Sequence, residues 1–198
     1  MDYKIADRAL APSGKKKIRW AKQYMPVLRL LEEKYRKEQP LAGTVISACL
    51  HLEAKTACLL ILLKDLGAKV TAAGSNPLST QDDICAALVE NGVSVFSRHG
   101  MTTEEYFVNV RSALSVKPNI IVDDGADLVA TVHSEMRDLL PGIRGGSEET
   151  TSGVKRLKSM ANGGVLAFPM ISVNDAHSKY LFDNRYGTGQ SVMDGILR

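Results

Sequence analysis

The alternation of short apolar segments with longer helical segments is the feature that most limits what this chain can fold into. The apolar segments are rich in β-branched residues and short enough to be buried strands. The segments between them carry apolar residues at helical spacing. Strand and helix alternate about five times, which predicts an α/β fold with a parallel, doubly wound sheet between two helical layers. The expected strands are residues 44–50, 69–73, 93–97, 119–122 and 165–173.

The expected helices end at recognisable sequence signals. Gly67 ends the helix of residues 53–66, and Asn91-Gly92 closes the next one, because glycine readily adopts the left-handed conformation that stops a helix. The first helix carries apolar residues on one face, so that face is expected to pack. The complete set is residues 15–38, 53–66, 80–90, 104–116, 128–139 and 149–160.

The composition argues against several classes of function. The net charge is only +3 with both signs interspersed, and aromatic residues make up 6% of the chain, so a nucleic-acid surface is not expected. No apolar run approaches the roughly 20 residues that cross a bilayer, and the N-terminus lacks an apolar signal core. Three cysteines without metal-type spacing fit a reducing compartment. We therefore expect a cytoplasmic globular domain that binds neither nucleic acid nor membranes.

Polar side chains stand where four of the expected strands end. His51 follows the first strand, Ser75-Asn76-Pro77 the second, Asp123-Asp124 the fourth and Asn174-Asp175 the last. In doubly wound sheets, ligands bind outside the carboxyl ends of the strands. These residues therefore predict a polar binding site at that edge.

The segment Asp123-Asp124-Gly125-Ala126-Asp127 has three open interpretations. Its carboxylates suit a hard metal ion such as Mg²⁺. They also suit a helix cap beside a general base, because burial at a strand end raises the pKa of a carboxyl group. The simplest interpretation is a turn followed by a cap.

A glycine-rich loop at residues 142–153 is expected to run directly into a helix. Such loops often cradle phosphate, but Glu148 and Glu149 in the first helical turn repel an anion. A ligand rich in hydroxyl groups is the better expectation. The Gly187-Thr188-Gly189 run lacks a third glycine and a preceding buried strand, so it is not a dinucleotide-binding turn.

Two further groups can carry chemistry. Lys179 and Asp183 are four residues apart and share a helix face, as a surface ion pair or as a lysine tuned by a carboxylate. His51 is the best catalytic candidate among four histidines, none of which forms a pair with metal-ligand spacing.

Several strings together resemble the adenosylhomocysteinase (S-adenosyl-L-homocysteine hydrolase) family, in order and over essentially the whole chain. They include Tyr3-Lys4-Ile5-Ala6-Asp7, Cys49-Leu50-His51, Ser75-Asn76-Pro77-Leu78-Ser79-Thr80-Gln81-Asp82, Asp123-Asp124-Gly125, Leu140-Pro141-Gly142-Ile143-Arg144-Gly145, Ser147-Glu148-Glu149-Thr150-Thr151, Asn174-Asp175, Phe182-Asp183-Asn184 and Asp194-Gly195-Ile196.

The resemblance implies the reversible, NAD-dependent hydrolysis of S-adenosyl-L-homocysteine to adenosine and L-homocysteine, by an enzyme that is a homotetramer at full length. NAD oxidises the ribose 3′-hydroxyl, the 4′ hydrogen becomes acidic, homocysteine leaves, water adds at C5′, and the stored hydride reduces the ketone. The implied sheet is flavodoxin-like, as in the substrate domains of formate-glycerate dehydrogenases. No metal is implied.

The resemblance also assigns roles to catalytic residues. Lys179 resembles the base at the 3′-hydroxyl, with Asp183 beside it and Asn174 orienting it. Asp124 resembles the group acting near the 4′ hydrogen, and His51 lies near the 5′ position.

The remaining implied positions bind substrate or cofactor. Glu149 resembles a ribose-hydroxyl ligand within the catalytic set. The substrate-binding positions are Glu53, Lys55, Thr56, Ser75, Asn76, Ser79, Gln81 and Thr188. The contacts to NAD are Thr150, Thr151, Ser152 and Asn184.

Two departures from the family pattern concern the substrate. Many members carry Thr and Glu at the positions of Glu53 and Lys55, and a lysine can only donate hydrogen bonds. Lys55 in direct contact suits a 6-oxo purine, which leaves S-inosyl-L-homocysteine as an alternative substrate; Glu53 can still accept from adenine. Ser75 and Thr188 stand where cysteines occur in some members.

The domain expectation is a substrate-binding domain at residues 1–186 and the start of a hinge helix toward an NAD-binding domain at residues 187–198. The chain alone is then expected to bind nucleoside without turnover. A non-catalytic S-adenosylhomocysteine-binding module is an alternative. The substrate domain of a 2-hydroxy-acid dehydrogenase is another, although Glu149-Thr150-Thr151 and the Lys179–Asp183 pair argue against it.

Overall fold

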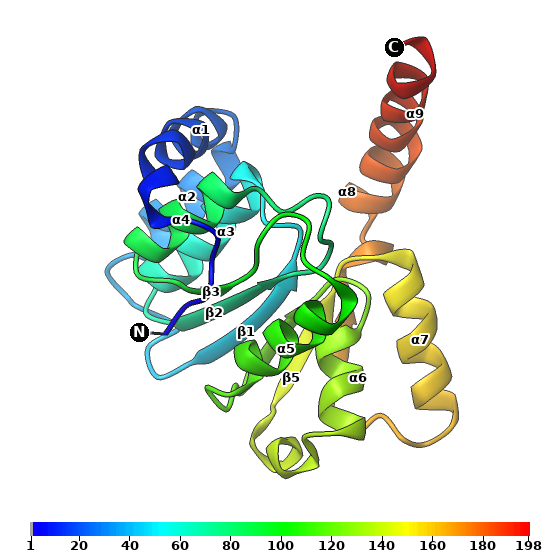
Figure 1. The fold of residues 1–198 in the computed structure, drawn as a ribbon. Coiled ribbons are helices and arrows are strands. Elements are labelled where there is room, and N and C mark those ends of the chain that lie inside the picture. Colours follow the sequence, from blue (N-terminus) through cyan, green and yellow to red (C-terminus); the bar gives the residue numbers. More distant parts are fainter. Residues whose placement is uncertain (1) are drawn as a thin grey trace.

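A single parallel sheet organises the chain, and the computed structural model describes residues 2–198 (Figure 1). The sheet has six strands in the order β3-β2-β1-β4-β5-β6, and every neighbouring pair is parallel. The predicted α/β class with a parallel sheet is confirmed. The strands are β1 Val45–Leu50, β2 Lys69–Gly74, β3 Ser94–Phe96, β4 Ile120–Asp123, β5 Gly145–Glu148 and β6 Met170–Ser172.

The strand order refines the expected topology. A flavodoxin-like sheet has the order 2-1-3-4-5, whereas here β3 lies outside β2, which gives the order 3-2-1-4-5-6 of the other common doubly wound sheet. Periodicity predicts that a segment is a strand but not on which side of the sheet it is added, so the sequence could not distinguish the two orders. The connections diverge between β1 and β4, and doubly wound sheets bind ligands at the point where the connections diverge.

Helices cover both faces, as expected for three layers (Figure 1). Side chains of β1 alternate between two apolar clusters: Ala48 and Leu50 pack toward α3 and α4, and Cys49 packs toward α5 and α6. Helices α1 and α2 lie outside α3 and α4. The α-helices of more than three residues are α1 Ala11–Gln23, α2 Pro26–Tyr35, α3 Ala54–Asp65, α4 Asp82–Glu90, α5 Thr103–Leu114, α6 Asp127–Ser134, α7 Thr151–Asn162 and α9 Thr188–Leu197.

Prolines and glycines shorten three of the expected elements. The helix expected at residues 15–38 is two helices, because Pro26 starts α2 and forces Met25 out of helical geometry. The helix expected at residues 128–139 ends at Ser134, and its last three residues belong to a 3₁₀ segment, Arg137–Gly142, that contains Pro141. The last strand begins only at Met170, since Gly164 turns the chain at φ +68° and residues 165–169 are irregular.

The glycine-rich segment is not a loop, contrary to expectation, but contains the inner strand β5. Gly146 carries no side chain because a Cβ atom there would lie 2.5 Å from the carbonyl oxygen of Ile121 and 2.8 Å from Sδ of Met170. Gly145 adopts φ +152°. Close packing between β4 and β6 therefore explains the glycines. Because residues 145–148 form a strand, Glu148 lies at the end of β5 and not in the helical turn that was expected.

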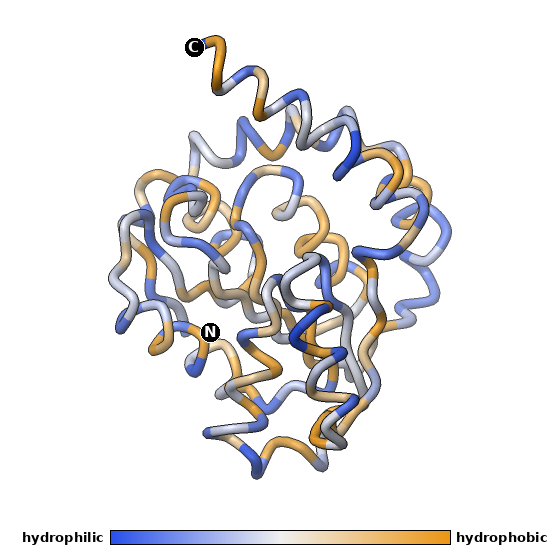
Figure 2. The backbone as a smooth tube through the Cα atoms, turned by 90° about the vertical axis from the view of Figure 1, so that its right-hand side faces the viewer, coloured by the Kyte–Doolittle hydropathy of each residue, from blue (hydrophilic) through white to orange (hydrophobic). Residues whose placement is uncertain are grey.

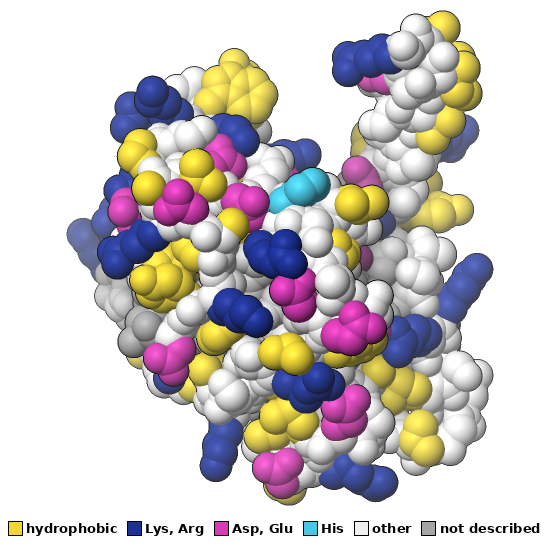
Figure 3. Space-filling view, in the orientation of Figure 1, with side chains coloured by type: hydrophobic (Ala, Val, Ile, Leu, Met, Phe, Trp, Pro, Cys, Tyr) yellow, Lys and Arg dark blue, Asp and Glu magenta, His cyan; other side chains and the backbone are white. Residues whose placement is uncertain are grey.

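The chain leaves the body of the fold at its C-terminal end. A short α8 (His177–Lys179) and a π-helical segment at residues 180–187 lead into α9, which stands away from the sheet (Figure 1). Apolar and polar residues are interspersed along this helix, as Figure 2 shows. Charged side chains of both signs are spread over the face in Figure 3. Among residues 2–198, none of the helices combines the length and apolar character that crossing a bilayer requires.

Candidate functional site

The carboxyl ends of the strands bring together polar side chains that are far apart in the sequence. They come from the segments that follow β1, β2, β4, β5 and β6. Two hydrogen-bonded groups result, one around Asp124 and one around Lys179.

The first group is centred on Asp124, whose side chain is only 8% exposed. Its Oδ2 accepts a hydrogen bond from Ser75 Oγ at 3.0 Å and lies 3.2 Å from Nε2 of His51. Nδ1 of His51 contacts the hydroxyl of Ser79. Because an ionised carboxylate cannot donate, Nε2 carries the proton in neutral His51, and Nδ1 can accept from the Ser79 hydroxyl, whose other acceptor is the Asn76 carbonyl at 3.3 Å. The imidazole is thereby held in one tautomer.

The second group is centred on Lys179, whose side chain is 16% exposed. Its Nζ donates to Oδ1 of Asn174 at 2.8 Å and to Oδ1 of Asn184 at 2.9 Å. The carboxylates of Glu149 and Asp183 lie 3.6 and 3.9 Å from Nζ, beyond hydrogen-bond distance. The third donor position of the ammonium group thus remains available beside two carboxylates.

Glu149 links the two groups electrostatically. Burial raises the pKa of its carboxyl group most, and the charge of Asp124 raises it further. The nearby ammonium of Lys179 acts in the opposite direction. A carboxyl group with a raised pKa exchanges protons closer to neutral pH, which suits acid–base chemistry.

Two buried carboxyl groups, Asp123 and Glu148, lie directly beneath this edge. They are paired in register at the ends of β4 and β5, and neither is exposed to solvent. Burial raises the pKa of Asp123 to about 8 and also raises that of Glu148. Asp123 accepts from the backbone N–H groups of Asp124 and Val129, at 3.1 and 3.0 Å.

Sequence reasoning placed Asp123 in the acidic turn but missed its structural role and that of Glu148. A detectable signal was present for Asp123, which directly follows the expected strand at residues 119–122, but not for Glu148, because no strand was expected before it. A charged residue at such a buried position must find several hydrogen-bond donors.

The structure disfavours the metal interpretation of the acidic turn, because its three carboxylates diverge. Asp123 points into the fold, and Asp124 faces His51. Asp127 accepts from Tyr106 at 2.7 Å and pairs with Arg156 at 2.7 Å. Within residues 2–198, no group of three or more His, Cys, Asp or Glu side chains is arranged to hold a metal ion.

The residues expected at the purine lie at the start of α3. Glu53 is the N-cap residue, and its Oε1 accepts from the backbone N–H of Thr56 at 2.8 Å. Its hydrogen bond to the Thr56 hydroxyl, at 3.3 Å, uses the same oxygen, so Oε2 remains free for a ligand. Lys55 is exposed.

Three other expected substrate positions already have partners within the fold. Gln81 accepts from Lys17 of α1 at 3.0 Å. Oδ1 of Asn76 accepts from the backbone N–H of Leu78 at 2.8 Å, so this side chain shapes the turn after β2. Thr188 is the first residue of α9 and donates to the carbonyl of Asp183 at 3.3 Å.

The four positions expected at NAD flank the Lys179 group. Thr151 donates to Oδ1 of Asn174 at 3.1 Å, and Asn184 accepts from Lys179. Thr150 is the N-cap residue of α7 and makes no side-chain capping bond, and Ser152 is exposed in the first turn. The helix start therefore offers free hydroxyl groups and amides to a polar ligand.

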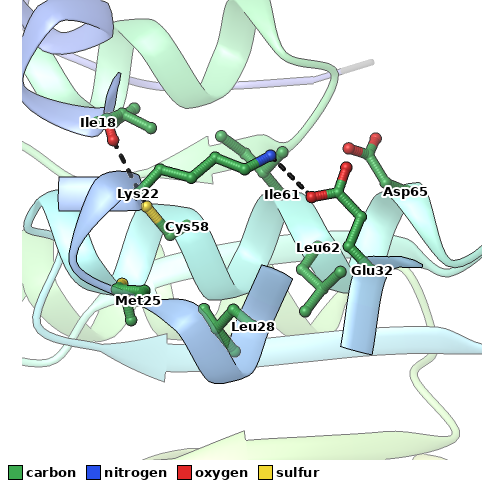
Figure 4. Close-up of a pocket in the computed structure, with 9 residues that line it drawn as sticks. All are labelled: Ile18, Lys22, Met25, Leu28, Glu32, Cys58, Ile61, Leu62 and Asp65. Carbon is green, nitrogen blue, oxygen red and sulfur yellow. Dashed lines mark hydrogen bonds and ion pairs between the residues drawn. The ribbon is translucent and has the colours of Figure 1, made fainter. Parts of the chain in front are cut away.

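A separate cavity lies between α1, α2 and α3, away from the strand ends (Figure 4). Its volume is about 30 Å³, enough for a single water molecule. Lys22 and Glu32 pair at 2.8 Å beside it. The cavity is a gap in helix packing and has no functional group in common with the strand-edge site. Its lining is Ile18, Lys22, Met25, Leu28, Glu32, Cys58, Ile61, Leu62 and Asp65.

Comparisons with known proteins identify the family of this chain. The family model described as S-adenosyl-L-homocysteine hydrolase matches residues 2–141 and 134–194. The chain is 56% identical over 197 residues to an adenosylhomocysteinase of Thermococcus kodakarensis, covering 100% of this chain and 47% of that protein. It is 54% identical over 194 residues to an S-inosyl-L-homocysteine hydrolase of Methanococcus maripaludis, covering 98% and 47%. The chain thus spans about half the length of the curated relatives it matches. It belongs to the S-adenosyl-L-homocysteine hydrolase family.

Proposed function

We propose that this chain forms the substrate-binding domain of an NAD-dependent hydrolase that converts S-adenosyl-L-homocysteine to adenosine and L-homocysteine. The observation that carries the proposal is the Lys179 group, in which two asparagine oxygens hold an ammonium beside two carboxylates. Such a set suits the vicinal hydroxyl groups of a ribose, since it offers donors and acceptors at one point. The family match and the names of the relatives support it.

The Lys179 group would receive the proton of the ribose 3′-hydroxyl. Asn174 and Asn184 fix the position of Nζ, and both accept from it. A neutral amine at this position can take a proton from a hydroxyl group in the space between Glu149 and Asp183. Glu149, whose pKa burial raises, accepts a hydrogen bond from a neighbouring ribose hydroxyl. Oriented donors and acceptors of this kind lower the cost of charge development.

The Asp124 group would act at the 4′ and 5′ positions of the same sugar. Asp124 would take the 4′ hydrogen as a proton, while Ser75 and His51 stabilise its charge. His51, with its Nε2–H on the same side, is placed to serve the sulfur or oxygen at the 5′ position. Two separate groups would thus divide the proton transfers, one acting at the 3′-hydroxyl and the other at the 4′ and 5′ positions.

The residues expected at NAD fit the cofactor in part. Thr150 and Ser152 offer groups at the start of α7, next to Thr151 and Asn184 in the Lys179 group. When bound, NAD supplies the oxidation and the later reduction at the ribose 3′ carbon. The chain's own contribution is to hold that edge of the cofactor against the sugar. We also propose a domain boundary near residue 187, where α9 begins, and that the chain alone binds nucleoside without turnover.

Titration calorimetry of the 198-residue chain with adenosine, inosine and S-adenosylhomocysteine tests the proposal. Binding of a purine nucleoside that is lost on removing the Lys179 ammonium would support it. Absence of binding to all three ligands would refute it. Release of homocysteine by the purified chain with added NAD would overturn the expectation that turnover is absent.

S-inosyl-L-homocysteine is the second candidate substrate, and Lys55 is the observation that favours it. Lys55 can only donate, which matches the 6-oxo group of hypoxanthine, whereas Glu53 keeps Oε2 free to accept from the 6-amino group of adenine. The relatives named for the two activities are similarly identical to this chain. A Lys55→Glu variant should shift the affinity ratio of inosine to adenosine toward adenosine. An unchanged ratio would remove Lys55 from purine selection.

A further inference from the structure

We propose that the buried carboxylate of Glu148 is the positioning residue of this site, which holds in place the two turns that present Asp124 and Glu149. The inference rests on the proposed function, which gives Asp124 and Glu149 their roles at the ribose. The hydrogen bonds between Glu148 and the backbone around these two residues do not depend on that function.

Glu148 ties together three backbone amides from two segments. Its Oε1 accepts from Gly125 and Thr150, both at 2.9 Å, and its Oε2 accepts from Ala126 at 3.0 Å. Gly125 and Ala126 directly follow Asp124, and Thr150 directly follows Glu149. One carboxylate therefore links the peptide that carries Asp124 to the peptide that carries Glu149, in addition to the backbone hydrogen bond that the Glu149 N–H donates to the Asp123 carbonyl at 3.0 Å.

The turn after Asp124 needs such an anchor. Gly125 adopts φ +109° and Ala126 adopts φ +61°, and the left-handed region is unfavourable for a residue with a Cβ atom. Ala126 is fully buried and starts α6 as its N-cap residue, without a side-chain capping bond. Charge-assisted hydrogen bonds to a carboxylate are about twice as strong as neutral ones, and they hold the strained turn.

The space around Glu148 is matched to its carboxylate. A Cβ atom on Gly153 would lie 2.2 Å from Oε1 and 2.3 Å from Cδ of Glu148. Gly153 lies within α7, where alanine is otherwise the more favourable residue. The close approach explains a glycine at this position and brings the first turn of α7 onto the carboxylate. Asp123, its partner in register, bonds other amides and cannot replace it.

The test measures two properties of Glu148→Gln: the chemical shifts and exchange rates of the three amide protons, and the affinity for adenosine. An amide side chain has the same shape but one acceptor oxygen fewer. We expect the amide protons of Gly125, Ala126 and Thr150 to shift upfield together and to exchange faster. Adenosine affinity should fall by about tenfold or more. Glu148→Asp keeps the charge and should recover part of the loss.

Gly153→Ala provides a second perturbation that keeps the carboxylate. Its Cβ displaces the Glu148 side chain, so the same three amides should change. Gly163→Ala, at the C-cap of α7, is the matched control because its Cβ meets only ordinary contacts. Leu60→Ala, which lowers stability in the opposite apolar cluster, should leave the amides and the affinity unchanged.

The outcomes separate this inference from the proposed function. Wild-type-like amides in both Glu148→Gln and Gly153→Ala would overturn the positioning role. An affinity loss in Glu148→Gln no larger than in Leu60→Ala would overturn it as well. If Glu148→Gln does not fold, Gly153→Ala alone decides. If the wild-type chain binds no nucleoside, the proposed function fails, whereas the amide measurement still decides whether Glu148 positions the two turns.

Discussion

Nε2 of His51, at the end of β1, lies 3.2 Å from Oδ2 of Asp124, at the end of β4. The two strands are neighbours at the point where the connections diverge. The pair closes one end of the candidate site, the end proposed for the 5′ substituent of the nucleoside.

Replacing His51 with alanine should discriminate between ligands that differ at the 5′ position. S-adenosylhomocysteine should lose about three- to tenfold in affinity, and 5′-deoxyadenosine should lose little, because only the former has a group for the imidazole to contact. Calorimetry with both ligands measures the ratio. His99→Ala, at an exposed histidine, is the control. Equal losses for the two ligands would place His51 away from the 5′ end.

Lys179→Met should weaken nucleoside binding while the fold persists. The methionine keeps the aliphatic stem but leaves the oxygens of Asn174 and Asn184 without their shared donor. We expect adenosine affinity to fall by about tenfold or more. Lys158→Met is the control, because Lys158 is exposed and pairs with Asp175 next to Asn174. A similar loss in both variants would indicate a general charge effect.

The buried carboxyl of Asp123 should make the fold less stable as pH rises. Its pKa is about 8 in the folded chain and about 4 in the unfolded chain. Between these values the folded state holds the extra proton. Its contribution to stability is therefore full below about pH 4 and is lost as pH rises to about 8, by at most roughly 1.4 kcal/mol per pH unit.

Asp123→Asn should flatten this slope, since an amide does not ionise. Urea unfolding at a series of pH values between 4.5 and 8.5 measures the effect. Asp138→Asn, at an exposed carboxylate, should keep the wild-type slope. If the two variants show the same pH dependence, burial of Asp123 is not its source.

Gly146→Ala should destabilise the sheet by about 1–3 kcal/mol. The new methyl group would approach the Ile121 carbonyl on one side and the Met170 sulfur on the other. Gly142→Ala is the control, because nothing lies within 4 Å of a Cβ atom there. The free energy of unfolding measures both. A neutral Gly146→Ala would mean that β4, β5 and β6 have room to separate.

The fold class could be predicted because alternation of apolar strands and helices is visible in the sequence. β5 was missed since Gly145 and Gly146 replace the apolar residues that mark a strand, and only their tertiary neighbours explain them: Pro169 beside Gly145, and Ile121 and Met170 beside Gly146. The break before Pro26 was overlooked because the apolar spacing continues across it. Element boundaries thus depend on single residues, whereas the class depends on the whole pattern.

The sequence predicted where the candidate site lies, but not which of its side chains are hydrogen-bonded to one another. The strand-end rule identified His51 and Asp124, and the structure brings them together. The hydrogen bond between Ser75 and Asp124 joins residues 49 positions apart, which no local pattern reveals. Glu148 was interpreted as part of a helical turn, because its role depends on amides of a distant segment. The roles of these residues remain predictions.

The assembly of the site from the ends of five strands has a consequence for how the chain folds. Its groups run from residue 51 to residue 184, and they meet only once β2, β1, β4, β5 and β6 lie side by side. A partly formed sheet would lack the complete binding site for a nucleoside. A nucleoside would therefore bind only the completely folded chain. A nucleoside added during refolding should stabilise the finished sheet without accelerating the steps that precede it.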